Sequence, residues 1–268
     1  MCLADEIKRR NNVKIIGKGQ KTLLLAHGFG CDQNMWRFLI ASLADNFTIV
    51  LFDYVGSGAS DISQYSKQRY SNLDGYAQDV IDICDALQLS KVVFVGHSVS
   101  SMIGAIAANK KPEYFSNLIM ICPSPCFLND PPDYAGGFET QDLLELLSIM
   151  NKNYIGWANY LAPLVLGDSN THEFMRELSG SFCSTDPVIA KTFAEATFLS
   201  DHRHLLTDIN QPTLIFQSQN DALAAVTVGE YMHKRIPNSK LSVIAADGHC
   251  LHMTHPNEIA QIIIEYLQ

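Results

Sequence analysis

Short runs of apolar residues alternate with helical patterns along most of the chain. From Thr22 onward these runs are nearly continuous in apolar residues, which is typical of parallel strands that helices cover on both faces. The predicted strands are 13–16, 22–26, 48–52, 91–95, 118–122, 213–217 and 241–245. The predicted helices between and after them are 36–43, 75–87, 102–109, 228–235 and 258–267. This alternation indicates one α/β layer structure with a mostly parallel sheet flanked by helices, rather than two domains in tandem.

Between Pro123 and Pro212 the alternation of predicted strands and helices stops. The pattern there predicts helices at 140–150, 154–161, 173–182 and 187–199, and no strand alternation is evident. A helical insertion rich in aromatic residues, placed between two core strands, predicts a cap over the active-site edge of the sheet. We therefore expect a core of residues 1–122 and 212–268 and a helical cap, or lid, at 123–211. The alternative is a small helical domain that has no role in binding.

Composition and charge exclude several classes of partner. The chain has 268 residues, of which 47% are apolar and 18% charged, so a sizeable buried core is expected. The net charge of -9 argues against a nucleic-acid partner and against tight binding to an anionic membrane. The first residues show no secretion-signal pattern, and no apolar run approaches the length of a transmembrane helix. Because the seven cysteines are odd in number and scattered, we expect reduced thiols in a cytoplasmic protein.

The segment Gly96-His97-Ser98-Val99-Ser100 follows an apolar strand and leads directly into a helix. A strand that stops at a glycine, presents a serine and begins a helix is the layout of a nucleophile elbow. The usual pattern is G-x-S-x-G, and here Ser100 takes the last position. The alternative is an ordinary strand-turn-helix that happens to contain a serine.

A serine hydroxyl needs a base to take its proton, and the base needs a partner that fixes its tautomer. In elbow-type hydrolases these partners follow the serine in the order acid, then histidine. Asp221 comes one loop after the strand at 213–217, and His249 follows the strand at 241–245. The sequence therefore predicts a catalytic triad of Ser98, Asp221 and His249.

Other roles are open for the acid and the histidine. Asp221 could be a turn or helix-capping residue, and His249 could be a solvated loop histidine. The spacing His249-x-x-His252-x-x-His255 also resembles a metal cluster. No cysteine or acidic partner is suitably placed, and Pro256 interrupts a continuous helix, so we expect neither a metal nor a cofactor.

Acyl transfer also needs hydrogen-bond donors aimed at the developing oxyanion. The backbone N–H of Val99, next to the nucleophile, is one candidate, and the N–H of Phe29 in His27-Gly28-Phe29-Gly30 is the other. The expected substrate-binding residues, in the cap or in loops that face it, are Phe29, Phe127, Phe138, Trp157, Tyr160, Phe198, Leu223 and Leu251. They indicate a compact apolar ester-type substrate with one carbonyl. Taken singly, each of these residues is as compatible with packing in the hydrophobic core as with lining a pocket. Trp157 and Phe198 are equally compatible with packing inside the cap.

Several further segments resemble the RsbQ-like hydrolases of the α/β-hydrolase superfamily, to which the plant karrikin and strigolactone receptors are similar. The segments are FDYVGSG (52–58), LDGYAQDV (73–80), PSPC (123–126), NDPP (129–132), GGFE (136–139) and STDPVIA (184–190). The resemblance runs over essentially the whole chain, including the cap. Ser100 matches the plant-receptor form of the elbow, and the loop after Asp221 lacks the usual proline.

This resemblance implies a V-shaped cap of four helices over a mostly apolar pocket, with a triad that matches Ser98, Asp221 and His249. It also implies a sensor that binds or slowly hydrolyses a small apolar compound and engages a protein partner. In the RsbQ-like case the partner is a PAS-containing serine phosphatase of the sigma-B stress pathway. Two alternatives stay open: a ligand-gated binding protein with little or no turnover, and an ordinary metabolic carboxylesterase.

Overall fold

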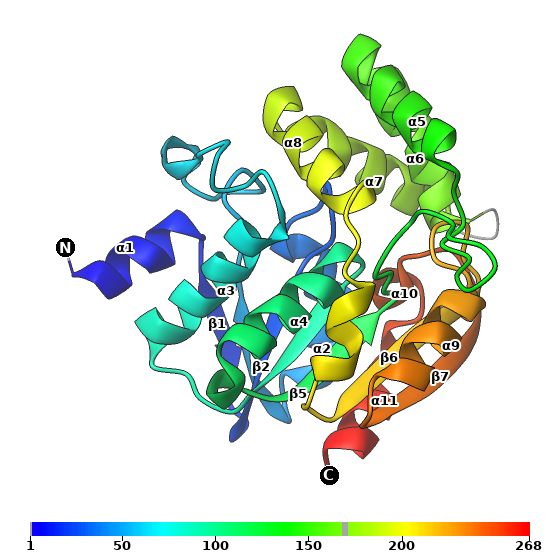
Figure 1. Cartoon of the computed structure of the whole chain (residues 1–268). Coiled ribbons are helices and arrows are strands. Elements are labelled where there is room, and N and C mark those ends of the chain that lie inside the picture. The colour runs from blue at the N-terminus through cyan, green and yellow to red at the C-terminus, as the bar shows by residue number, and fades with distance from the viewer. Residues whose placement is uncertain (1, 168–170) are drawn as a thin grey trace.

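The computed structural model describes residues 2–167 and 171–268, in which a seven-stranded sheet forms the centre of the molecule (Figure 1). The strands are β1 (Lys14–Gly17), β2 (Lys21–Ala26), β3 (Phe47–Leu51), β4 (Val92–His97), β5 (Phe115–Ile121), β6 (Thr213–Asn220) and β7 (Ser239–Asp247). Their order is β1-β3-β2-β4-β5-β6-β7, and β1 alone pairs antiparallel with its neighbour. The mostly parallel α/β sheet that the sequence predicts is confirmed.

Helices flank this sheet, and side chains alternate between its two faces. The flanking helices are α1 (Leu3–Arg10), α2 (Arg37–Leu43), α3 (Leu73–Leu87), α4 (Val99–Lys110), α9 (Val226–Arg235), α10 (Leu251–Thr254) and α11 (Pro256–Leu267). Short 3₁₀ helices span Gln33–Trp36, Ile62–Gln64, Pro112–Tyr114 and Arg203–Asp208. On β2, Leu23 and Leu25 pack in one core with α2 and α11, whereas Leu24 and Ala26 pack in the other with α3 and α4. Burial on both faces explains the continuous apolar runs of the strands.

Four helices come between β5 and β6 and are called the helical insertion below. They are α5 (Thr140–Lys152), α6 (Tyr154–Leu166), α7 (His172–Ser184) and α8 (Pro187–Phe198). Figure 1 shows them together at the top of the view, beyond one edge of the sheet. Helix α6 packs against both α5 and α7, and α8 packs against α5. Apolar side chains of the insertion join the same core as α2 and α11.

The sequence pattern predicts no element before residue 13, but the structure has helix α1 there. Helix α1 packs on α3 through the buried side chain of Ile7. Arg10, at its end, forms ion pairs with the wholly buried Asp79 at 3.2 Å and with Asp82 at 2.9 Å. These contacts with a distant helix stabilise α1, and a local apolar pattern cannot show them.

The cysteines and the helices can be compared with the expectation of reduced thiols and no transmembrane helix. All seven cysteines are free thiols, and Cys31, Cys84, Cys122, Cys126 and Cys250 are buried. Across the described residues, every helix is too short or too polar to cross a lipid bilayer.

Candidate active site

Ser98 stands in a sharp turn between β4 and α4. Its backbone has φ 55° and ψ −124°, which is a strained conformation for a residue with a Cβ. The backbone N–H of Ser98 donates to the carbonyl of Ile121 at 2.8 Å and so fixes the turn to β5. A Cβ on Gly96 would lie 2.6 Å from the backbone of Ser100, so this crossing of strand and helix requires glycine. The geometry is that of a nucleophile elbow.

The side chains of Ser98, His249 and Asp221 form one hydrogen-bonded chain. Nε2 of His249 lies 2.8 Å from Oγ of Ser98, and Nδ1 of His249 lies 2.6 Å from Oδ2 of Asp221. The three residues follow β4, β7 and β6, and all three are buried. Ser98 therefore has a base within hydrogen-bond reach, and the base has a carboxylate that fixes its tautomer.

Asp221 is held as an anion by its surroundings. Its Oδ1 accepts hydrogen bonds from the backbone N–H groups of Leu223 at 2.8 Å and Ala224 at 3.1 Å. Burial opposes its ionisation, but the charge and hydrogen bond of His249 and these two N–H groups outweigh burial and lower the pKa of Asp221. The loop after Asp221 lacks a proline, and the carboxylate itself organises that loop.

Ser100 takes the elbow position that is usually glycine, and its hydroxyl is fully engaged. It donates to the backbone carbonyl of His27 and lies 3.0 Å from the hydroxyl of Tyr54. His27 directly precedes Gly28 and Phe29, the loop in which the sequence predicts an oxyanion donor. The hydroxyl of Ser100 therefore fastens α4 to this loop.

His97, next to the nucleophile, connects the same loop to the base. Its buried ring donates from Nε2 to the backbone carbonyl of His249 at 2.9 Å. Burial lowers the pKa of His97 to about 3, so the ring is neutral. A Cβ on Gly28 would lie 2.4 Å from Nδ1 of His97, so the imidazole packs directly against the backbone of the loop. His97 thus positions two loops of the site.

A narrow cavity of about 30 Å³ lies beside Ser98 and His249. Its further lining residues are Phe29, Cys31, His97, Phe127, Leu161, Val165, Leu178, Phe182, Thr197, Phe198, Leu223 and Cys250. None of these lining residues is a lysine, an arginine or a carboxylate. The walls therefore suit a compact, uncharged and mostly apolar group.

Phe29, Phe127, Phe198 and Leu223, four of the expected substrate-binding residues, line this cavity. The other four do not. Trp157 is buried against Phe29, Tyr154 and Phe182, Leu251 is wholly buried, and Phe138 packs against Phe127. The expectation for Tyr160 is corrected: its side chain is 58% exposed on α6. A helix carries aromatic residues on its buried face and on its exposed face, and composition does not show on which face a given residue lies.

Five cavity residues from the helical insertion were not predicted from the sequence. Leu161 and Val165 are four residues apart on α6, as are Leu178 and Phe182 on α7, and Thr197 lies on α8. Residues four apart share one face of a helix, so this spacing was a usable signal for the first two pairs. Thr197 had no such signal.

One group of side chains in the described part of the chain has the spacing of metal ligands. The ligand atoms of Cys122, Asp221 and His249 all lie within 4.8 Å of one another. Asp221 and His249 are already hydrogen-bonded to each other, and burial raises the pKa of the Cys122 thiol, which disfavours a thiolate ligand. His252 and His255 do not join His249 in a comparable group among these residues.

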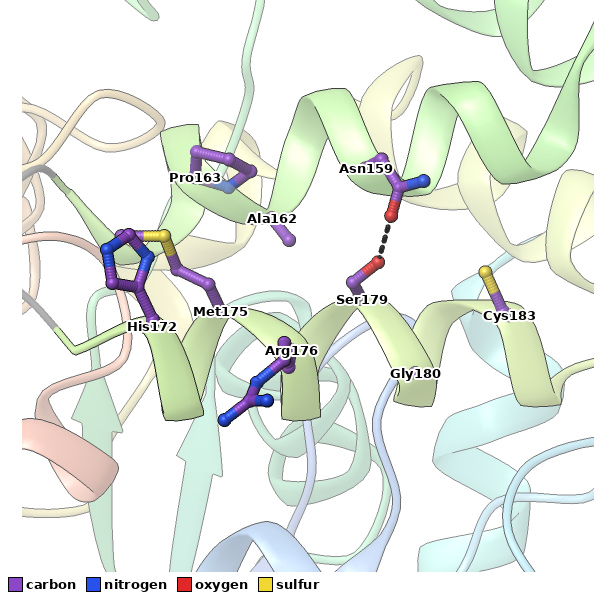
Figure 2. Close-up of a pocket in the computed structure, with 9 residues that line it drawn as sticks. All are labelled: Asn159, Ala162, Pro163, His172, Met175, Arg176, Ser179, Gly180 and Cys183. Carbon is purple, nitrogen blue, oxygen red and sulfur yellow. Dashed lines mark hydrogen bonds between the residues drawn. The ribbon is translucent and has the colours of Figure 1, made fainter.

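A separate and wider groove of about 750 Å³ lies between α6 and α7 (Figure 2). Its lining is partly polar, and the side chains of Asn159 and Ser179 form a hydrogen bond across it. None of the three triad residues lines this groove. Ser98 and His249 instead line the narrow cavity.

This fold and this site define an α/β-hydrolase. The family model for the alpha/beta hydrolase fold matches residues 21–256, and the chain belongs to that family.

Similar proteins and solved structures narrow the comparison. The chain is 38% identical to the karrikin insensitive 2 receptor CA of Petunia hybrida, with 97% of both chains covered. It is 36% identical to a strigolactone esterase of Arabidopsis thaliana, with 94% of both chains covered. Among solved structures, a hydrolase from Oleispira antarctica is 58% identical with a TM-score of 0.97, over 99% of this chain and 97% of that chain. The predicted relation to α/β-hydrolases, including karrikin and strigolactone receptors, is confirmed.

Proposed function

We propose that this protein is a serine hydrolase that cleaves small, mostly apolar esters or lactones. The observation that carries this proposal is the unbroken hydrogen-bonded chain from Asp221 through His249 to Ser98, beside an apolar cavity. A strigolactone esterase among the relatives supports the same class of reaction.

Each member of the chain has a separate role in the reaction. His249 takes the proton of the Ser98 hydroxyl at Nε2 as the oxygen attacks the substrate carbonyl carbon. Asp221 stays ionised and offsets the positive charge that His249 gains. The proton then passes to the departing alkoxide, which leaves an acyl ester on Ser98. A water molecule deprotonated by His249 attacks that ester, releases the acid and restores the hydroxyl.

The backbone N–H groups of Phe29 and Val99 are the proposed donors to the oxyanion. Val99 is the first residue of α4, and the first N–H groups of a helix have no acceptor within the helix. Phe29 lines the cavity, and the hydroxyl of Ser100 holds its loop through the carbonyl of His27. Such donors stabilise the charge that develops on the carbonyl oxygen.

We propose that residues 123–211 act as a cap on a core of residues 1–122 and 212–268. Six of the cavity-lining residues come from the helical insertion. The backbone N–H of His249 also donates to the carbonyl of Val165 on α6 at 2.6 Å. A cap placed in this way excludes water and strengthens the electrostatic interactions around Ser98.

In its finer form, the proposal is a slow hydrolase that acts as a sensor in stress signalling. A relative that is named a receptor and the narrowness of the cavity support this role. The state with ligand bound would engage a protein partner in the cytoplasm, for which a PAS-containing serine phosphatase of the sigma-B type is the proposed candidate. The receptor name also favours a second function, a ligand-gated binding protein with little turnover.

The test compares wild type with Ser98→Ala on p-nitrophenyl acetate and p-nitrophenyl butyrate, with intact-mass analysis of both proteins. We expect turnover or an acyl adduct in wild type only, with both proteins folded. A surface variant, Ser71→Ala, serves as the control and is expected to keep wild-type activity. Undiminished turnover in Ser98→Ala would refute the triad. Neither turnover nor adduct in folded wild type would favour the binding protein over both the sensor hydrolase and an ordinary carboxylesterase.

A further inference from the structure

Thr197 carries a buried hydroxyl that the described residues leave without a partner. Its side chain lies near the end of α8 with 3% of the residue exposed, and its Oγ1 makes no hydrogen bond to the described part of the chain. Thr192, on the same helix, shows the usual alternative, because its hydroxyl donates to the carbonyl of Val188 at 3.0 Å. A buried hydroxyl without a partner is costly, so Thr197 indicates a partner that is not part of the protein.

The hydroxyl of Thr197 belongs to the wall of the catalytic cavity. Thr197 lines that cavity together with Ser98 and His249. The wall around it is mostly hydrocarbon, with Phe29, Leu161, Val165, Phe182 and Phe198 among its residues. A polar group in such a wall determines how an apolar ligand is oriented.

The ring nitrogens of the cavity wall offer no free donor to a ligand oxygen. Both ring nitrogens of His249 are used in the triad. Nε2 of His97 donates to the carbonyl of His249, so Nδ1 of this neutral ring carries no proton: it has no partner among the described residues and cannot donate to a ligand oxygen. Apart from Ser98 itself, Thr197 therefore presents the one hydroxyl among the cavity-lining residues that is free to bind a ligand atom.

We propose that Thr197 is a specificity-determining residue that donates a hydrogen bond to a second, uncharged oxygen of the substrate. This rests on the proposed function, in which Ser98 engages the reacting carbonyl. The substrate class is then a small ester or lactone whose apolar frame carries one further acceptor, such as an ether, keto or second ester oxygen. A carboxylate or phosphate is a poor fit, because no lysine or arginine among the lining residues would balance its charge.

Ester pairs that differ in one atom test this role. p-Nitrophenyl methoxyacetate has an ether oxygen where p-nitrophenyl butyrate has a methylene group, and the 3-methoxypropionate and valerate esters form a second such pair. For each pair, kcat/KM is measured in wild type, Thr197→Val and Thr197→Ser. Valine keeps the shape and removes the hydroxyl, whereas serine keeps the hydroxyl. Thr192→Val is the matched control, since it removes a hydroxyl that is bound within α8.

The measured quantity is the ratio of kcat/KM for the ether ester to kcat/KM for the alkyl ester. Comparing this ratio between variants cancels the intrinsic reactivity of the two acyl groups. We expect Thr197→Val to lower the ratio about 10-fold or more in at least one pair, and Thr197→Ser and Thr192→Val to keep it. An unchanged ratio in Thr197→Val for both pairs overturns the assignment, and Ser98-dependent hydrolysis would still support the proposed function.

Binding without turnover separates the two proposals. In the Ser98→Ala background, titration calorimetry compares methyl methoxyacetate with methyl butyrate, with and without Thr197→Val. Loss of a preference for the ether ligand on Thr197→Val supports the role of Thr197, even if wild type hydrolyses no ester and the hydrolase proposal fails. If the preference for the ether ligand is the same with and without Thr197→Val, the proposed role of Thr197 is overturned.

Discussion

The hydroxyl of Ser100 joins α4 to the loop that carries Phe29. It donates to the carbonyl of His27 and meets the hydroxyl of Tyr54, in a region that is wholly buried. Glycine at this position of the elbow would leave both groups without this partner. The departure from the usual elbow pattern therefore has a structural consequence at the proposed oxyanion site.

Ser100→Ala is expected to lower both stability and turnover. The change leaves the His27 carbonyl and the Tyr54 hydroxyl without their partner, which costs about 1–3 kcal/mol of unfolding free energy. We expect kcat to fall more than KM rises, because the loop that holds the Phe29 N–H loses its anchor. Urea unfolding and ester kinetics check this. The control is Ser101→Ala, because the hydroxyl of Ser101 donates to the carbonyl of Gly96 within the elbow. Equal losses in the two variants would contradict a special role for Ser100.

Asp221→Asn tests the other end of the triad. An amide can donate to Nδ1 of His249 and so favours the wrong tautomer of the base. By analogy with serine proteases, kcat is expected to fall by roughly 10³–10⁴-fold with the fold unchanged. Steady-state kinetics and circular dichroism measure the two parts of this prediction. The exposed variant Asp133→Asn should behave as wild type. Turnover within a few-fold of wild type in Asp221→Asn would remove Asp221 from the mechanism.

At the residue scale, the sequence reveals the triad and conceals Thr197. Ser98, Asp221 and His249 each follow an apolar strand, and parallel strands bring their carboxyl ends to one edge of the sheet. Their meeting was therefore predictable. The partner of a hydroxyl on an apolar helix depends on the rotation of that helix and on what it covers. That information exists only in three dimensions.

At the scale of the element, α6 supports both loops of the site. The carbonyl of Val165 accepts the backbone N–H of His249 at 2.6 Å. Trp157, two turns earlier on the same helix, packs edge-on against Phe29 with ring centroids 5.9 Å apart and stacks on Tyr154 at 5.6 Å. A shift of α6 would therefore reach the base and the proposed oxyanion loop together.

Trp157→Ala is expected to weaken the helical insertion without changing substrate preference. Loss of the buried indole costs roughly 3–5 kcal/mol. The kcat/KM values for acetate and butyrate esters should fall together, because Trp157 does not line the cavity. Thermal unfolding and kinetics on both esters measure this. Tyr160→Ala is the matched control: its ring is 58% exposed on the same helix, and its removal should change stability by at most about 0.5 kcal/mol. A shift in the butyrate-to-acetate ratio for Trp157→Ala would instead place the indole in the substrate pocket.

Elements that bury a regular apolar face were predictable, and elements held by polar contacts were not. The strand predicted at 213–217 continues to Asn220, and the one predicted at 241–245 spans Ser239–Asp247. The added residues are mostly polar, and backbone pairing between β6 and β7 holds them in the sheet. Helix α1 is stabilised in a similar way, by the ion pairs of Arg10 with α3.

At the scale of the whole molecule, segments far apart in the sequence meet through buried histidines. His27 follows β2, His97 ends β4 and His252 lies in α10. The rings of His97 and His252 lie 4.3 Å apart between centroids, and neither ring nitrogen of His252 has a partner among the described residues. Burial lowers the pKa of all three, that of His97 to about 3. Burial therefore favours the neutral form of all three rings in the folded protein.

These histidines predict a loss of stability in mild acid. Below about pH 6.5 the unfolded chain binds more protons at these residues than the folded chain does, so the unfolding free energy decreases as the pH falls. A ring held fully neutral contributes about 1.4 kcal/mol per pH unit in that range. Urea unfolding between pH 7.5 and pH 5.5 measures the slope, and His252→Leu should flatten it because one titrating group is gone. The exposed control His204→Leu should keep the wild-type slope. If His252→Leu also keeps the wild-type slope, His252 binds a proton in the folded protein, and its burial does not hold the ring neutral.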